Sequence, residues 1–433
     1  MPYTKPKGTN DMLPARARAW ANFLKSADKV FSVYGYEPIT TPVFEKSEVF
    51  TRGCGEDSDV ASKEIFSVFS KGALSALSEG RNLKADQKLA LRPEGTASVV
   101  RAIAENNLVT QGSQPAKLYY AGPMFRCERP QKGRYREFWQ VGVECLGATE
   151  QTADAEAIIM CMRFFEELGL PKDCMQLFIN SMGCKECRPA YIDAVKKYMQ
   201  SKKDALCDEC VRRTNSNPLR VLDCKNPACA AVICDAPKFS DYLCDECRKK
   251  FDELQRYLEV AKIDYIIEPT LVRGFDYYTG AVFEVQMKEG LGSQSAIGGG
   301  GRYDGLSKEL GGSNISGLGF AVGFERIMIA LESCGVETDV AQEIKVYVAA
   351  VNSDVNEQVF CILQTLRDKE ISAISDTQGR SLKSQFKAAG KLNVSFVVVV
   401  GPDELERGEV IVRDMRTHTE KLVKLCDILK ACR

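Results

Sequence analysis

The spacing of apolar residues near the start of the chain predicts a helix followed by an extended segment. Between residues 15 and 33, apolar side chains recur every three or four positions, as on one face of a helix, and Gly35 follows as a turn residue. Segment 35–45 contains Pro38 and Pro42, which favour an extended strand at the edge of a sheet. The pattern therefore predicts a long helix that leads into an edge strand.

Two later segments have the pattern of a β-hairpin. Segments 117–125 and 137–146 are rich in strand-forming residues, and a long polar loop, 126–136, separates them. Further along the chain, segment 317–326 runs from a predicted strand into a short helix at 327–331. This part of the chain therefore mixes helices with short strands.

After Gly335 glycine becomes sparse and strands alternate with helices, which is typical of a separate α/β domain of about 90 residues. The predicted strands are 345–351, 371–375, 396–400 and 409–412, and the predicted helices are 356–369, 382–389 and 421–432.

Composition and charge exclude several classes of protein. The chain has 433 residues, of which 45% are hydrophobic and 27% charged, and this is ordinary globular usage for two or three domains. Lys plus Arg (58) nearly equals Asp plus Glu (59), so a nucleic-acid partner would need local basic patches. Apolar runs are too short to span a bilayer and the N-terminus lacks an apolar signal region. We therefore expect a cytoplasmic protein with no membrane partner.

The chain has a single histidine, His418. It stands among Arg416, Thr417 and Thr419 with nothing nearby to orient it, so we interpret it as a solvated turn residue. Ser-His or Cys-His catalysis and histidine-rich metal sites are thereby almost excluded.

Nine of the 18 cysteines lie between Cys184 and Cys247, and six of these form three Cys-x-x-Cys pairs. Two such turns brought together supply four thiolates to one tetrahedral ion, the arrangement of structural zinc. Reduced thiols packed as small hydrophobic groups, or a disulfide framework, are the alternatives, and cytosolic redox conditions disfavour disulfides. We predict at least one structural Zn²⁺ site, with the pairing left open. The candidate ligands are Cys184, Cys187, Cys207, Cys210, Cys224, Cys229, Cys244 and Cys247.

The polar loop 126–136 holds five basic residues and one acidic residue. Arginine binds phosphate through two parallel hydrogen bonds and keeps its charge, so a loop held between two strands suits a nucleoside triphosphate or an RNA end. A solvated charged loop is the alternative. The chain contains neither a P-loop nor a Gly-x-Gly-x-x-Gly fingerprint, so arginines would have to bind any phosphates.

Three further segments carry residues suited to a ligand. Segment 271–280 adds Arg273 beside two tyrosines, and Arg326 stands near a predicted helix start, which favours anions. Four consecutive glycines at 298–301 predict a loop that faces a ligand, with a structural turn as the alternative. Glu94 and Glu144 lie among these basic segments, where each could pair with an arginine or recognise a cationic amine or imidazole.

These segments together resemble a known family. Segments 35–45, 117–147 with its Phe125-Arg126-Cys127-Glu128 core, and 317–326 are similar to the three ordered motifs of class II aminoacyl-tRNA synthetases. Segments 271–278 and 300–305 resemble the two signatures of the histidyl-tRNA synthetase family. The similarity begins at Gly8-Thr9-Asn10-Asp11 and extends into the C-terminal domain, which resembles that family's anticodon-binding domain.

The resemblance implies a fold and an organisation. We expect an α+β catalytic core, an antiparallel sheet flanked by helices of the class II synthetase type, with a cysteine-rich helical insertion and a C-terminal α/β domain. The insertion is expected to clasp the acceptor stem of a tRNA. The expected ranges are 1–179 for the first part of the core, 180–262 for the insertion, 263–334 for the second part of the core and 343–433 for the anticodon-binding domain.

The resemblance also implies an activity: a homodimer that joins L-histidine to tRNA-His with ATP and Mg²⁺. Arg126 and Arg273 would be catalytic residues at the α-phosphate, and Glu144 and Tyr278 would recognise the imidazole. The implied histidine-binding residues are Glu94, Gly95, Thr96, Arg126, Gln140, Glu144, Arg273, Tyr277 and Tyr278, and the implied ATP-binding residues are Arg126, Glu128, Arg134, Arg273 and Arg326.

Other classes of function compete with this interpretation. A non-catalytic relative, the regulatory subunit of ATP phosphoribosyltransferase, resembles the core but typically lacks the histidyl signatures and the anticodon domain. This chain contains both of these features. A tRNA-binding or stress-sensing module would not need arginines at an ATP site. A class I synthetase needs a His-x-Gly-His motif, which a chain whose single histidine is His418 cannot contain.

Overall fold

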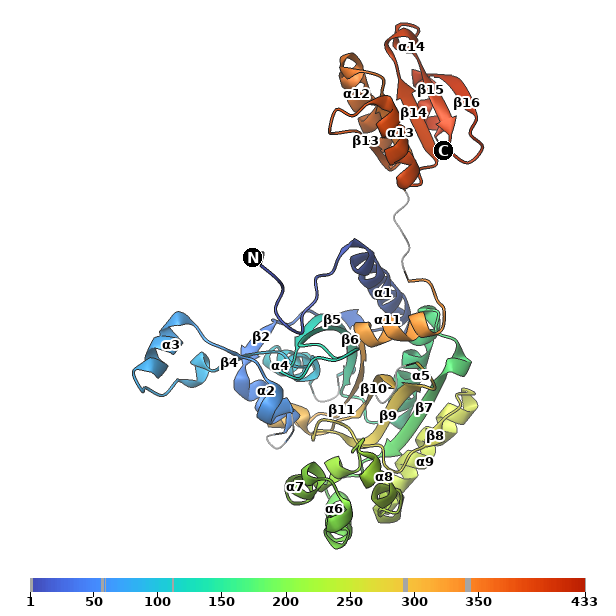
Figure 1. Ribbon diagram of the computed structural model, residues 1–433. Helices are drawn as coiled ribbons and strands as arrows, with labels where there is room; N and C mark the ends of the chain where they lie inside the picture. Colours follow the sequence, from blue (N-terminus) through green and yellow to red (C-terminus); the bar gives the residue numbers. More distant parts are fainter. Residues whose placement is uncertain are drawn as a thin grey trace. The chain divides into compact units, whose positions relative to one another are not determined.

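The computed structural model describes residues 3–55, 58, 60–110, 113–290, 295–338 and 344–432. The chain divides into two compact units, Met1–Asp339 and Val340–Arg433 (Figure 1). Each unit has its own hydrophobic core. Among the described residues, every helix is too short or too polar to cross a membrane.

An eight-stranded sheet forms the centre of the first unit, in the order β1-β5-β6-β11-β10-β9-β7-β8. The interior pairs are antiparallel, and β1 and β8 pair in parallel at the two edges. This confirms the predicted antiparallel core. The strands are β1 (Glu37–Pro38), β5 (Ala116–Phe125), β6 (Glu137–Leu146), β7 (Met175–Ser181), β8 (Ile266–Ile267), β9 (Thr279–Met287), β10 (Ala296–Arg302) and β11 (Gly317–Gly323).

Helices cover the sheet, and a small antiparallel sheet stands beside it in the order β2-β4-β3. Its strands are β2 (Phe44–Lys46), β3 (Ser67–Val68) and β4 (Leu89–Leu91). The helices of the unit are α1 (Pro14–Val33), α2 (Ser47–Cys54), α3 (Lys71–Ser78), α4 (Thr96–Glu105), α5 (Gln151–Glu167), α6 (Arg188–Ser201), α7 (Asp208–Ser216), α8 (Pro227–Cys234), α9 (Asp245–Val260), α10 (Leu306–Glu309) and α11 (Phe324–Ser333).

The alternation of side chains along each strand divides the sheet into a packed face and a functional face. On β6, Val141 and Val143 belong to the core that α1, α5 and α11 cover, so Gln140 and Glu144 point to the opposite face. Strand β11 follows the same rule, because Phe320 is in that core and the alternate positions are small. The polar residues of the strands therefore gather on one side of the sheet.

Several predicted elements are confirmed. The predicted first helix corresponds to α1, and the predicted hairpin corresponds to β5 and β6, which pair antiparallel along their whole length. Helix α11 begins at Phe324, slightly earlier than predicted. The cysteine-rich segment forms α6 to α9 between β7 and β8, inside the predicted range 180–262, whose boundaries remain a prediction.

The second unit is built on a five-stranded sheet in the order β13-β12-β14-β15-β16. Strands β13, β12 and β14 run parallel, and β15 and β16 continue the sheet antiparallel. The elements are β12 (Val346–Ala350), α12 (Asn356–Arg367), β13 (Ala373–Ser375), α13 (Leu382–Lys391), β14 (Phe396–Val400), α14 (Pro402–Glu406), β15 (Glu409–Asp414), β16 (Glu420–Lys424) and α15 (Ile428–Ala431).

The C-terminal segment corrects one prediction. A helix was expected over 421–432, but Glu420–Lys424 forms strand β16 on the edge of the sheet, and only Ile428–Ala431 is α-helical. The strand forms because its backbone pairs with β15, an interaction that the local pattern of apolar residues does not reveal. His418 lies in the exposed turn between these two strands with φ of 57°, as its interpretation as a turn residue requires.

Candidate active site

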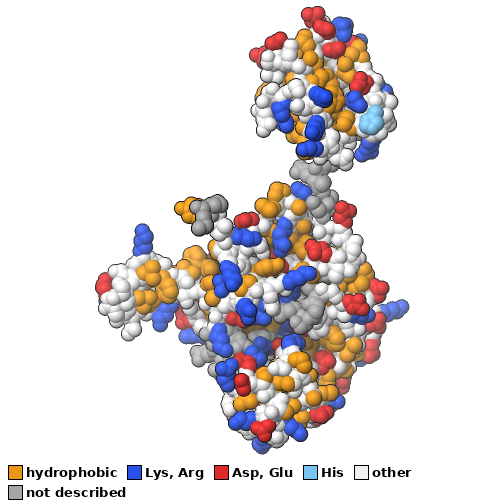
Figure 2. Space-filling model, in the orientation of Figure 1, with side chains coloured by type: hydrophobic (Ala, Val, Ile, Leu, Met, Phe, Trp, Pro, Cys, Tyr) orange, Lys and Arg blue, Asp and Glu red, His pale blue; other side chains and the backbone are white. Residues whose placement is uncertain are grey.

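A cavity of about 920 Å³ opens on the polar face of the sheet, a size typical of ligand sites. Strands β6, β9, β10 and β11, the loops 126–135 and 268–278, and part of the cysteine-rich segment line it. Figure 2 shows Lys and Arg side chains gathered around the hollow of the first unit. The predicted site residues that line the cavity are Glu94, Thr96, Arg126, Glu128, Arg134, Gln140, Arg273, Tyr277, Tyr278 and Arg326.

Glu94 lies at the start of α4 with both carboxylate oxygens engaged. It accepts hydrogen bonds from the backbone N–H groups of Thr96 (2.6 Å) and Ala97 (2.8 Å), which are otherwise unpaired at a helix N-terminus. Burial raises the pKa of Glu94, and these hydrogen bonds oppose the increase. Gly95 is behind the cavity wall, where a Cβ would lie 2.2 Å from the ring of Tyr120, so only glycine fits there.

Glu144 lies immediately behind the cavity wall. Its carboxylate accepts hydrogen bonds from the hydroxyl of Thr96, at 2.7 Å, and from the hydroxyl of Tyr303. Both of these donors line the cavity. Burial raises the pKa of Glu144 well above its usual value, and the two hydrogen bonds oppose the increase. A ligand at this end would therefore meet Thr96 and Tyr303 first, with a buried carboxyl group behind them.

Arg126 and Arg273 are held by aromatic rings and by one polar partner each. The Arg126 guanidinium stacks on Phe138 and Phe275, with 5.2 and 5.7 Å to the ring centres, and donates to the carbonyl of Pro93. Arg273 donates to Glu284 at 2.8 Å and lies over the ring of Tyr278. Both side chains are thus fixed in place while their charge still faces the cavity.

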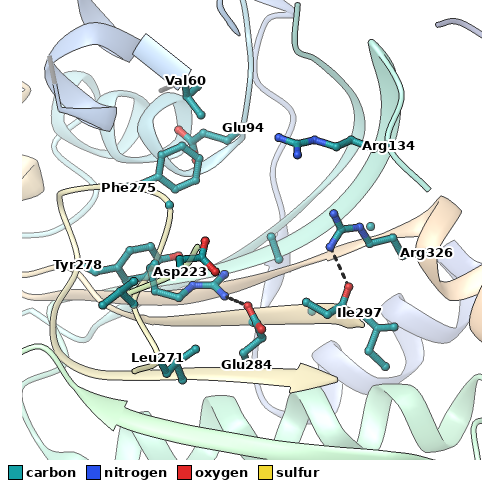
Figure 3. A pocket seen from close by; sticks show the side chains of 18 of the residues that line it. Val60, Glu94, Arg134, Asp223, Leu271, Phe275, Tyr278, Glu284, Ile297 and Arg326 are labelled. Atoms are coloured by element: carbon teal, nitrogen blue, oxygen red, sulfur yellow. Dashed lines mark hydrogen bonds and ion pairs between the residues drawn. The ribbon is translucent and has the colours of Figure 1, made fainter. Parts of the chain in front are cut away.

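Arg134 and Arg326 form the other side of the site, facing Glu94, Phe275 and Tyr278 across the cavity (Figure 3). Arg326 donates to the carbonyl oxygens of Ala296 (2.9 Å) and Gly133 (3.4 Å). Burial, together with the like charges of Arg126 and Arg134, lowers the pKa of Arg326. A polyanion placed among these arginines would relieve that repulsion.

Glu128 pairs with Arg134, which is also 3.5 Å from Glu64. The loop arginine that was predicted to meet ATP is therefore held by carboxylates from its own and a neighbouring segment. A phosphate at this position would compete with those carboxylates for the guanidinium.

Gly298–Gly301 do not form the predicted loop but lie within β10, in the middle of the sheet. A Cβ on Gly300 would lie 1.9 Å from the carbonyl oxygen of Gly319, and one on Gly299 would lie 2.9 Å from Nη1 of Arg273. The glycines are required because neighbouring strands and Arg273 approach this backbone closely. Gly298 and Gly299 still line the cavity, so their backbone can approach a ligand closely, as expected.

The rings of Tyr277 and Tyr278 pack against each other at an angle of 42° with centres 4.7 Å apart, and both residues line the cavity. Gln140 Oε1 is buried and has no hydrogen-bond partner among the residues that the structure describes. Because a buried amide oxygen is costly without a donor, this atom suits a ligand with an N–H or ammonium group.

Several residues of the site were not among those predicted from the sequence. Glu284 and Gln286 line the cavity from β9, and Tyr303 and Tyr120 complete the wall near Glu144. Glu284 and Gln286 could have been predicted from the sequence. They alternate with Phe283, Val285 and Met287 and must therefore face the other side of the sheet. The cysteine-rich segment also contributes lining residues, namely Glu209, Arg213, Arg220, Leu222, Asp223, Cys224 and Lys225.

The eight candidate cysteines gather into two groups of four, and within each group all Sγ atoms lie within 4.8 Å of one another. We call Cys184, Cys187, Cys244 and Cys247 the outer cluster and Cys207, Cys210, Cys224 and Cys229 the inner cluster. The structure thus supplies the pairing that the sequence left open, and it places the exposed Cys234 in neither group.

Comparisons with known proteins give concordant matches over both units. A family model described as Histidyl-tRNA synthetase matches residues 8–327, and one described as Anticodon binding domain matches residues 345–433. The chain is 44% identical to a histidine–tRNA ligase of Halothermothrix orenii over 98% of this chain and 97% of that protein. It is also 44% identical to a histidine–tRNA ligase of Desulforamulus reducens over 98% of each chain. The solved structure of apo histidyl-tRNA synthetase from S. aureus superposes with a TM-score of 0.81 at 31% identity over 99% of both chains.

Proposed function

The chain belongs to the histidyl-tRNA synthetase family, and we propose on this premise that its cavity joins histidine to tRNA-His in two steps. In the first step a carboxylate oxygen of histidine attacks the α-phosphorus of ATP, and pyrophosphate leaves as the P–O bond to it breaks. In the second step a ribose hydroxyl of the 3′-terminal adenosine attacks the histidyl carbonyl, and AMP leaves. The enzyme is thus a class II ligase that forms AMP and pyrophosphate.

Arginines from three elements support the first step. Arg126 and Arg273 are fixed by rings and partners around one part of the cavity, so they would stabilise the charge that develops at the α-phosphate. Arg326, with Glu128 and Arg134, would hold the rest of ATP. Mg²⁺ bound with ATP would neutralise phosphate charge as pyrophosphate forms. Arg126 and Arg273 would need little reorganisation, because rings and polar partners hold their guanidinium groups.

Polar groups at the other end suit histidine. Glu94 and Gln140 would bind its ammonium group, and Thr96, Tyr277 and Tyr278 would surround the side chain. Glu144 would recognise the imidazole from behind Thr96 and Tyr303, whose hydroxyls it now holds. A site with such buried polar groups rejects analogues that leave them unpaired.

The observation that carries the proposal is the placement of these histidine-site and phosphate-site residues around one cavity in a full-length member of the family. Amino-acid-dependent exchange of pyrophosphate into ATP, run with each of the 20 amino acids, tests it without tRNA. We expect exchange with histidine alone. Absence of exchange with every amino acid, from folded protein, would instead favour the regulatory relative of ATP phosphoribosyltransferase, which the intact site and the anticodon-domain match support less well.

The second unit is expected to bind the anticodon part of tRNA-His, since its residues match the anticodon-binding model. We also propose that the enzyme is a homodimer formed through segment 35–45 and that it acts in the cytoplasm, where its tRNA substrate occurs. Sedimentation analysis checks the first of these two points: a monomer at micromolar concentration with full activity would contradict it.

We further propose that the cysteine-rich segment binds structural Zn²⁺. Each four-cysteine group uses all of its ligand positions for protein thiolates, so the metal would stabilise the segment and leave no position open for chemistry. Elemental analysis of protein purified without added zinc tests this. A metal-to-protomer ratio near zero, with unchanged stability after chelation, would contradict it.

A further inference from the structure

The sulfur geometry of the two clusters matches metal coordination and excludes disulfides. A tetrahedral zinc site with Zn–S bonds of about 2.3 Å places its sulfur atoms roughly 3.8 Å apart. In the outer cluster Cys184 Sγ lies 3.7 Å from Cys187 Sγ and 3.9 Å from Cys244 Sγ. In the inner cluster Cys207 Sγ lies 3.9 Å from Cys224 Sγ. A disulfide would need about 2.05 Å.

Backbone N–H groups are aimed at the sulfur atoms of both clusters. In the outer cluster Cys184 N donates to Cys187 Sγ at 3.2 Å, and Glu186 N donates to Cys184 Sγ at 3.4 Å. In the inner cluster Asn226 N donates to Cys224 Sγ, also at 3.4 Å. Such donors stabilise thiolate charge and fix the orientation of metal ligands. Each cluster also has two buried cysteines and two partly buried ones, so both are closed.

The outer cluster is connected to the segment that carries Tyr278. Arg188, the residue after Cys187, donates to the carbonyl oxygens of Met182 (3.1 Å) and Tyr278. The backbones of Met182 and Gly280 are also hydrogen-bonded, at 2.6 Å. The segment that carries Tyr278 is therefore fastened to the turn that presents the first cysteine pair.

The inner cluster fastens a different part of the site. Segment 217–225 follows Cys210 and contains the third ligand, Cys224, and Arg220 Nη1 lies 3.4 Å from the carbonyl oxygen of Arg273. Asn217 donates to Asp276 at 3.0 Å, and Cys224 itself lines the cavity. The inner cluster therefore supports the loop of the arginine proposed to act at the α-phosphate.

We propose that the clusters are two separate Zn²⁺ sites with different effects on the reaction: the outer metal positions Tyr278 for histidine binding, and the inner metal positions Arg273 for adenylate formation. Four cysteine thiols lose their protons as each ion binds, and no redox change occurs. This inference rests on the proposed function, because it assigns each metal to one end of the proposed active site. The cysteines are positioning residues, since they act through Arg188 and through segment 217–225.

The test compares one ligand variant from each cluster in the full-length protein. We expect two Zn²⁺ per protomer in the wild type, and one each in Cys244→Ser and Cys229→Ser. Cobalt substitution should give the thiolate-to-metal absorption of two tetrahedral sites, halved in either variant. In pyrophosphate exchange, Cys244→Ser should raise the histidine KM about tenfold with kcat little changed. Cys229→Ser should lower kcat about tenfold and leave the histidine KM within about threefold.

Further measurements separate this inference from a folding defect and from failure of the proposed function. Cys244→His can still bind zinc, so it should have the wild-type metal content and histidine KM that Cys244→Ser lacks. Circular dichroism shows whether the serine variants are folded. Fewer than two metal ions in the wild type, or the same kinetic change in both serine variants, would overturn the inference. If the wild type binds two metals but exchanges with no amino acid, the proposed function fails while the two metal sites stand.

Discussion

Arg273 combines a charge that faces the cavity with contacts that prevent it from moving away. We predict that Arg273→Gln, which removes the guanidinium charge and its contact with Glu284, lowers kcat/KM for histidine-dependent pyrophosphate exchange by about 10²–10³-fold, because one preorganised charge contact to the transition state is lost. Steady-state kinetics measure the change. A loss below about threefold would show that Arg273 does not act at the reacting phosphate.

Arg81 provides a matched control for this substitution. It pairs with Glu79 on an exposed part of the chain, at 2.7 Å, and lies outside the cavity lining. Exposed ion pairs contribute little to stability, so Arg81→Gln should leave both exchange kinetics and melting temperature almost unchanged.

Glu144 leads to a prediction about pH. Burial raises its pKa, so the folded chain binds this proton more tightly than the unfolded chain, and the free energy of unfolding falls as pH rises from about 4.3 toward the raised value. Glu144→Gln has no proton to lose. We therefore expect the stability of the variant relative to wild type to increase with pH across this window, by up to about 1.4 kcal/mol per unit. Urea denaturation at several pH values tests this; a difference independent of pH would refute it.

At the scale of elements, strand β10 can pair with its neighbours only because it contains glycines, which have no side chain. Gly300→Ala would place a Cβ 1.9 Å from the Gly319 carbonyl oxygen in the neighbouring strand, so the two strands would have to separate. We predict destabilisation of about 3 kcal/mol or more. Gly323→Ala is the control, since Gly323 ends β11 with φ of −85° and open space around its Cβ position. Thermal melting of both variants tests this, and equal melting temperatures would contradict the packing argument.

The same strand shows what local patterns can and cannot predict. The β5–β6 hairpin was predictable because its arms have strand-like composition and adjoin one polar loop. The glycines of β10 were mistaken for a loop because nothing in their own sequence shows that they pair with β9 and β11. Strand β16 was missed for a related reason, since these five residues on a sheet edge owe their conformation to β15.

At the scale of the whole molecule, the two units have separate cores, so we expect each unit to have its own function. We predict that a truncated chain, residues 1–338, folds and keeps histidine-dependent pyrophosphate exchange within about fivefold, because the cavity lies wholly in the first unit. Charging of tRNA-His should fall far more, since the second unit is absent. Parallel exchange and charging assays test this, and equal losses in both would contradict separate roles.

For the candidate site, too, the sequence does not reveal which distant segments the fold brings together. Most of its residues could be proposed from motifs, because each motif is local and carries its own chemistry. That Arg126, Arg273 and Arg326 meet around one cavity depends on a sheet order in which β6, β11, β10 and β9 are neighbours. The pairing of the first cysteine pair with the third likewise requires the helices between them to fold back.

That pairing has a consequence for the synthesis of the protein. Cys184 and Cys244 are 60 residues apart, and the whole inner cluster lies between them in the sequence. All four inner cysteines therefore emerge from the ribosome before Cys244 and Cys247 do. Metal loading during translation would then follow a fixed order, with the inner site complete while the outer site still holds only half of its ligands.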